Sequence, residues 1–248
     1  MRRPEGPDPA FPSSANASDV PKGRAGSAVR LTRKQATQEL ILDTAERLFA
    51  EHGMFAVSNR QIGEAAGQGN TAVVGYHFGS KADLVRALVR RHTAEVERVR
   101  EAMLAEVGDS TEVRDWVACL VRPTTDHLAA LGTPTWFARF GAQVMTDPAL
   151  REIMVSESLA SPSLQQTLDG LNRCLPSLPL DVHLERGDIG RHLIVHMCAE
   201  RERALAEGAP TPRATWQEAA SGLIDALVGM WLAPVSAVEG SRTVEELA

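Results

Sequence analysis

Apolar residues recur along this chain at intervals of three and four, the spacing of helices that bury one face. Between residues 40 and 49 this stripe consists of Leu40, Ile41, Thr44, Ala45, Leu48 and Phe49. Gly53 follows and is expected to end the helix. Met54, Phe55 and Val57 are expected to continue the core beneath the next helices. No stretch shows the alternation of a β-strand, so the pattern predicts an all-α fold.

Residues 58–81, SNRQIGEAAGQGNTAVVGYHFGSK, predict two short helices joined by a tight turn, with a third helix directly after them. The S-x-x-Q spacing that begins at Ser58 is that of a capping box and predicts a helix start. Gly67 suits the left-handed position after a helix end. Gly69 or Asn70 is expected to cap a second helix of about two turns. Helix, glycine-containing turn and helix together are typical of a helix-turn-helix.

The second helix of this pair is expected to expose Asn70, Thr71 and Tyr76, which are small or hydrogen-bonding side chains. Such side chains suit a helix that lies in the major groove of DNA and contacts base edges. Short capped helix pairs also occur in bundles that do not contact DNA, so spacing alone leaves both interpretations open.

Ser80 and Asp83 repeat the capping spacing, and apolar periodicity then runs from Lys81 to near Gly108, which predicts a long linking helix. Later helices are expected at about 111–131, from Pro134 to 145, from Pro148 to 159, and at 163–175, 183–206 and 214–233.

Composition places the domain boundaries. Residues 1–31 are rich in Pro, Ser, Gly and Ala and are expected to form a disordered, weakly basic tail, with the first helix starting near Thr32. We expect a helix-turn-helix domain at 32–92, a helical regulatory and dimerisation domain at 93–235, and a loose tail at 236–248.

Charge is unevenly distributed over a net charge of −6. Residues 1–92 hold 13 Lys and Arg against 9 Asp and Glu, whereas residues 93–248 hold 13 against 23. A weakly basic front and an acidic body fit one domain that meets phosphates and another that does not. Three widely spaced cysteines argue against a disulfide framework. We see no signal peptide or transmembrane run, so we expect a cytoplasmic protein without membrane contact.

Three segments resemble the N-terminal domain of the TetR family of transcriptional regulators. They are ILDTAERLFAEHG (41–53), SNRQIGEAAG (58–67) and YHFGSKADLVRAL (76–88). The last is the most specific, because an aromatic-His-Phe leaves the second helix of the pair and Ser-Lys opens the next helix. The chain departs from the common pattern by one extra residue between Gly67 and Phe78 and by Gly75, where an aromatic is frequent.

The resemblance implies the DNA contacts. Tyr76, His77 and Lys81 fall where family members touch phosphates. Base contacts are expected from residues around the turn, and Val73, where exposed, could meet a thymine methyl. The full set of expected DNA-binding residues is Ser58, Arg60, Gln68, Asn70, Thr71, Tyr76, His77 and Lys81.

The resemblance also implies a homodimeric repressor of a palindromic operator on double-stranded DNA, paired through the last two long helices and released by a small apolar ligand. No cofactor is expected. Aromatic and methionine side chains suit an apolar pocket, although for any one of them ordinary core packing is the more common role. The candidate pocket residues are Trp116, Phe137, Phe140, Met145, Met154 and Met197.

A rival interpretation uses His192, His196 and Glu200, which are spaced i, i+4, i+8 on one helix face. Such spacing can supply metal ligands and would suit a helical metal-binding protein or an enzyme. Arginines crowd the same helix, and no catalytic signature such as H-E-x-x-H or G-x-S-x-G occurs in the chain. We therefore expect neither a metal site nor an enzyme.

Overall fold

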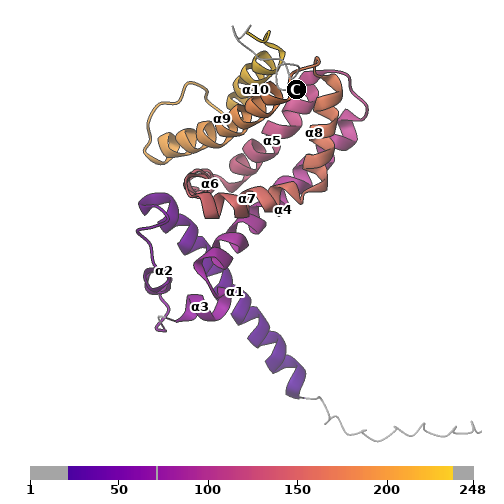
Figure 1. Cartoon of the computed structure of the whole chain (residues 1–248). Coiled ribbons are helices and arrows are strands. Elements are labelled where there is room, and N and C mark those ends of the chain that lie inside the picture. Colours follow the sequence, from indigo (N-terminus) through magenta and orange to yellow (C-terminus); the bar gives the residue numbers. More distant parts are fainter. Residues whose placement is uncertain (1–21, 71, 237–248) are drawn as a thin grey trace, which may run out of the picture. The chain divides into compact units, whose positions relative to one another are not determined.

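The computed structural model describes residues 22–70 and 72–236, with side chains from Thr32 onward. Within these residues every regular element is a helix, so the predicted all-α class is confirmed (Figure 1). The helices are α1 (Lys22–His52), α2 (Asn59–Ala65), α3 (Val73–Phe78), α4 (Lys81–Val107), α5 (Val113–Leu131), α6 (Phe137–Thr146), α7 (Pro148–Leu159), α8 (Pro162–Cys174), α9 (Leu180–Ala206) and α10 (Trp216–Leu232).

The first helix begins about ten residues earlier than the sequence predicted. It starts at Lys22 instead of near Thr32, so part of the expected disordered tail is helical. Once a helix exists, each added residue contributes one hydrogen bond, and Ala, Arg and Lys are favourable helix formers. The chain divides into two units between Gln38 and Glu39, and every contact below lies in the second unit.

From Glu39 onward, α1 packs with α2, α3 and the first turns of α4 around an apolar core. Ile41 and Phe49 of α1, Ile62 of α2, Val74 of α3 and Leu88 of α4 are all fully buried. Two sequence expectations were wrong here. Leu40 is 45% exposed and Phe55 is 84% exposed. Leu40 lies at the edge of its stripe, and Phe55 lies in a connection whose path no periodicity predicts.

Local capping signals placed the starts of α2 and α4 correctly. The hydroxyl of Ser58 accepts from the amide of Gln61, and the Gln61 side chain accepts from the amide of Ser58. Ser80 and Asp83 form the same reciprocal box in front of α4. These contacts use backbone donors that would otherwise lack partners in the first helical turn. The two predicted capping boxes are therefore confirmed.

A second core is formed by α4, α5, α8, α9 and α10, in which α5 packs against α4, α8 and α10. Asp147 caps α7 and Pro148 opens it, as predicted. The expectation that Pro134 lies in the first turn of α6 was wrong, because that helix begins at Phe137. Its first amides, on Ala138 and Arg139, donate to the carboxylate of Glu202 on α9, so a distant residue determines where the helix begins.

Trp116 is the largest fully buried side chain, and its indole nitrogen donates to the carbonyl of Ser110 at 2.9 Å. Gly170 of α8 lies directly on the ring, and a Cβ at this position would overlap the indole carbons. The glycine therefore allows α8 and α5 to approach closely, and rigid ring atoms cannot easily move away.

We expect Gly170→Ala to lower the free energy of unfolding by about 2 kcal/mol or more, because overpacking costs more than the gain in helix propensity. Chemical denaturation measures this change. The matched control is Gly75→Ala on α3, where a Cβ would meet nothing within 4 Å. The control is expected to be neutral or slightly stabilising, and equal effects of both substitutions would contradict the proposed overlap.

Candidate functional site

The connection between α2 and α3 is fixed by its own backbone and by one amide side chain. Gly67 has a φ of +65°, and the amide of Gln68 donates to the carbonyl of Gly63 at 3.0 Å. The side-chain oxygen of Asn70 accepts from the amide of Ala72 at 2.9 Å. Asn70 thus stabilises the turn before α3, although the helix itself begins at Val73, later than predicted.

The short α3 is held by two buried valines. Val74 is fully buried, as expected of the inward anchor. Val73 is also buried, so the suggestion that it could reach a thymine methyl was wrong. Tyr76 on the same helix is 77% exposed, and its ring meets the ring of the half-buried His77 edge-on at 5.0 Å between centroids.

The other predicted DNA-binding residues lie around this helix pair. Arg60 is exposed on α2, where its Nε donates to Glu64 at 2.8 Å. The half-buried Gln68 uses its side-chain nitrogen to donate to the carbonyl of Ala66. Thr71 lies outside the described residues. The structure thus brings Ser58, Arg60 and Tyr76 to the surface of one helix pair, and their contacts with DNA stay predictions.

Lys81 differs from expectation. Its ammonium donates to the carbonyl of Met54 and, at 2.7 Å, to that of Val57, and it lies 5.3 Å from the ring centroid of Phe49. Burial lowers the pKa of this ammonium. The expected phosphate contact stays a prediction, although in the structure the ammonium points inward and secures the connection between α1 and α2.

A cavity with a volume of about 560 Å³ is lined by residues of α4 to α10. Its wall includes Phe137, Met145 and Met154, three of the predicted pocket residues. The other three lie elsewhere. Trp116 and Phe140 are fully buried core residues, and Met197 is 56% exposed on α9. Helical periodicity identifies apolar positions but does not distinguish a cavity wall from a filled core.

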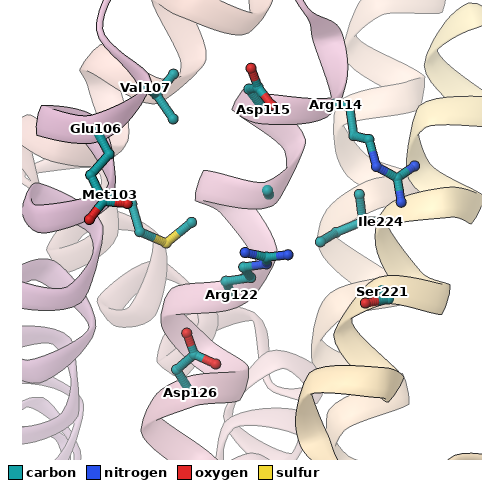
Figure 2. A pocket seen from close by; sticks show the side chains of 10 residues that line it. Met103, Glu106, Val107, Arg114, Asp115, Arg122, Asp126, Ser221 and Ile224 are labelled. Carbon is teal, nitrogen blue, oxygen red and sulfur yellow. The ribbon is translucent and has the colours of Figure 1, made fainter.

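A second depression of about 390 Å³ lies between α4, α5 and α10 (Figure 2). Its wall carries charged groups from two helices, including Glu106 of α4 and Arg122 and Asp126 of α5. Arg114 at its edge pairs with Asp225 of α10 at 2.6 Å. This charged wall does not match the apolar ligand expected from the sequence.

A chain of buried hydrogen bonds joins α1, α4 and α5, and sequence patterns gave no indication of it. His92 Nε2 lies 2.9 Å from the carboxylate of Glu46, and His92 Nδ1 lies 2.8 Å from His127 Nε2. Because a carboxylate only accepts, Nε2 of His92 donates to it. Phe137 stacks on His92 with 4.1 Å between ring centroids and also lines the cavity.

In this buried chain of hydrogen bonds, the pKa values of His127 and Glu46 are shifted. Burial, together with the neighbouring charge of His92, lowers the pKa of His127 to about 4. Burial raises the pKa of Glu46, but its hydrogen bond to His92 and the charges of His92 and Arg91 outweigh that effect and hold the pKa below its usual value. The neutral imidazole of His127 is thus the form that the fold stabilises.

The rival metal face has other partners in the structure. His192 Nδ1 contacts the carbonyl of Asp188 at 2.7 Å, and Glu200 pairs with Arg203 at 2.7 Å. Within residues 32–70 and 72–236, no group of three or more His, Cys, Asp or Glu side chains is arranged to hold a metal ion. None of the described helices combines the length and apolar character needed to cross a membrane.

Comparison with known families assigns both parts of the chain. Residues 41–88 match the model described as bacterial regulatory proteins, tetR family, and residues 118–230 match the model described as tetracyclin repressor-like, C-terminal domain. The chain belongs to the TetR family. The matched segments contain the α2–α3 pair in the first and most of the cavity wall in the second.

Individual relatives of this TetR-family chain are similar over about a third of its length. The HTH-type transcriptional repressors AcnR of Corynebacterium efficiens and Corynebacterium glutamicum are each 37% identical over 87 residues, which is 33% of this chain and 46% of the relative. The matched region thus spans about half the length of these curated relatives.

The solved structures of two TetR-family proteins are also similar. The regulator PfmR of Thermus thermophilus is 16% identical, with a TM-score of 0.46 over 79% of this chain and 96% of that chain. A putative regulator of Mesorhizobium loti is 15% identical, with a TM-score of 0.45 over 81% of this chain and 99% of that chain.

The lowered pKa of His127 generates a prediction for the pH dependence of stability. An unfolded histidine binds protons below about pH 6.5, whereas folded His127 stays neutral down to about pH 4. The stabilisation is therefore complete above pH 6.5 and is lost as pH falls towards 4. We expect a loss on the order of 2 kcal/mol between pH 7 and pH 5. The groups that face His127 are His92, Glu46, Glu95 and Arg91.

Denaturation of His127→Gln at the two pH values tests this origin, because the variant removes the titrating ring but keeps a hydrogen-bond donor. The loss between pH 7 and pH 5 should shrink in this variant. His52→Gln, at an exposed histidine that ends α1, should behave like the unmodified protein. An unchanged acid sensitivity in His127→Gln would contradict the assignment.

Proposed function

We propose that this chain is a sequence-specific DNA-binding transcriptional regulator, a repressor released from a palindromic operator by a small-molecule ligand. The observation that carries the proposal is the capped α2–α3 pair, anchored by Val74 and exposing Tyr76, in a chain of the TetR family. The repressors named among its relatives support the direction of regulation.

The proposed DNA surface divides by chemistry. Ser58 at the start of α2, together with Tyr76 and His77, would contact phosphates, since helix N-termini, phenols and imidazoles suit them. Gln68, Asn70 and Thr71 would contact base edges around the start of α3. Among the described residues Arg60 pairs with the exposed Glu64, and an exposed pair contributes little stability, so Arg60 can exchange that partner for a guanine or a phosphate at little cost.

We also propose a homodimer through α9 and α10. A helix-turn-helix reads a palindrome when two copies stand about one helical turn apart. Both helices expose large apolar side chains, and such surfaces are typical of association sites. These exposed residues are Leu180, Leu184, Ile189 and Met197 on α9 and Leu232 on α10.

Helix α4 offers the route from ligand to DNA. Its residues Val89, Thr93 and Val96 line the cavity, while Leu84 and Leu88 of the same helix belong to the core beneath α2 and α3. A ligand that favours one position of α4 would change the separation of two recognition helices in a dimer. Such a change is a population shift driven by differential affinity for the two states.

Selection of duplexes from a random pool by the purified chain tests the proposed function. We expect enrichment of an inverted repeat with half-sites about 10 base pairs apart, bound as a dimer. Arg98→Ala provides a control, because this exposed arginine of α4 pairs with Glu95 away from the helix pair. Failure to enrich any duplex at low salt, or a bound sequence without symmetry, would overturn the proposal.

Tyr76 and Lys81 are expected to behave differently when mutated. Tyr76→Phe should weaken DNA binding roughly three- to tenfold at unchanged thermal stability, since it removes one exposed hydroxyl. Lys81→Met should lower the free energy of unfolding by about 1.5–3 kcal/mol, because it removes charge-assisted hydrogen bonds to two carbonyls.

Binding titrations over a salt series distinguish the two roles of Lys81. If its ammonium stays inside the domain, Lys81→Met should leave the slope of log affinity against log salt unchanged. A slope reduced by about 1, together with unchanged thermal stability, would instead show that the ammonium contacts a phosphate.

A further inference from the structure

One buried cation lies in the wall of the 560 Å³ cavity. Arg100 of α4 lines this cavity, and its side chain is only 8% exposed. Its Nε donates to the carbonyl of Cys119 at 3.1 Å, and its Nη1 donates to the hydroxyl of Ser163 at 3.3 Å. No hydrogen bond or ion pair among the described residues uses its second terminal nitrogen, Nη2.

The nearest carboxylate does not fully neutralise this arginine. Glu97 lies 3.8 Å from Nη1, beyond hydrogen-bond distance. Its two oxygens instead accept from the hydroxyl of Ser161 and from the amide of Ser163, at the N-terminus of α8. Burial lowers the pKa of Arg100, as expected of a cation with incomplete compensation. A buried charge of this kind favours an anionic partner.

The other arginine of the cavity wall is compensated. Arg191 of α9 donates to the carboxylate of Asp188 at 2.7 Å, and both residues line the same cavity. Its side chain is 34% exposed, so solvent also screens its charge. Nη1 of Arg191 has no hydrogen-bond partner among the described residues, but its guanidinium is paired directly with Asp188, whereas no carboxylate lies within hydrogen-bond distance of Arg100.

Most of the remaining wall is apolar. It includes Val96 of α4, Leu120 of α5, Phe137 and Met145 of α6, Met154 of α7 and Leu168 of α8. A volume of about 560 Å³ is in the range of cavities that enclose small organic ligands. Methionine side chains adapt to the shape of a ligand. Burial of an apolar part of the ligand against this lining is favourable.

We propose that this cavity binds an amphipathic carboxylic acid, with the carboxylate on the Arg100 guanidinium and the apolar body along the wall that contains Phe137, Met145 and Met154. The inference rests on the proposed function only in taking the bound acid as the effector that releases DNA. Nη2 offers the carboxylate a charge-assisted hydrogen bond at the cavity wall. A cationic amphiphile would meet like charge there and bind poorly.

Matched pairs of probes test the preference on the unmodified full chain. Calorimetric titration compares decanoic acid with decan-1-ol, and 2-naphthoic acid with 2-naphthalenemethanol, below the concentrations at which they self-associate. We expect the acid to bind at least roughly tenfold more tightly than the alcohol in one pair or both. The pair that shows the preference identifies an aliphatic or an aromatic body. Equal affinity for acid and alcohol in both pairs, or no binding by any probe, overturns the proposal.

Substitutions then locate the preference. Arg100→Met replaces the cation by an apolar side chain that the cavity tolerates, and it should lower affinity for the acid roughly tenfold while sparing the alcohol. Arg100→Gln, which keeps a donor for the Cys119 carbonyl, provides a second variant if the first does not fold. Arg191→Met is the matched control and should retain the preference. Loss of preference in Arg191→Met but not in the Arg100 variants would contradict the assignment.

A DNA-release assay distinguishes the two proposals. If the acid binds through Arg100 but leaves DNA affinity unchanged, the ligand class stands and ligand-controlled repression fails. If DNA binds but neither probe pair shows an acid preference, the proposed regulator stands and the ligand class fails.

Discussion

The buried contact of Glu46 with His92, continued to His127, is the constraint on which the arrangement of this chain depends. It joins α1 of the helix-turn-helix part to α4 and α5 of the bundle through buried groups. Each polar group in such a chain costs free energy if it loses its partner, so the three helices are held in one relative position. Arg91, which also pairs with Glu46, adds a further link between α1 and α4.

This buried contact connects the cavity to the helix pair that is proposed to bind DNA. Phe137 stacks on His92 and also lines the cavity. A ligand that moves this ring therefore acts directly on the hydrogen bonds that join Glu46, His92 and His127. Arg100 lies two turns further along the same helix, at a place where charge is incompletely neutralised. The cavity and the helix pair thus share α4 as a common element. A ligand with different affinities for two positions of α4 would bias both sites together.

Local chemistry made part of this structure predictable from the sequence. The capping residues Ser58, Ser80 and Asp147 mark helix starts through contacts within three residues, and Val74 is fixed by helical periodicity. Long-range contacts could not be predicted. Glu202 determines the start of α6 from more than sixty residues away, and Lys81 points inward because two carbonyls of a preceding connection accept from it. Three of the six candidate pocket residues line the cavity, whereas Trp116 and Phe140 look like Phe137 in the sequence but fill the core.

Amide hydrogen exchange, measured with and without a selected duplex, is the most direct test. It asks whether the α2–α3 pair and the buried hydrogen bonds of Glu46, His92 and His127 act together in DNA binding. We expect DNA to slow exchange over residues 58–80 and also in the turn of α4 around His92, because holding the helix pair in place stabilises the contacts beneath it. Protection confined to α9 and α10, or a bound duplex that leaves residues 58–80 unprotected, would contradict the proposed interface and its link to the bundle.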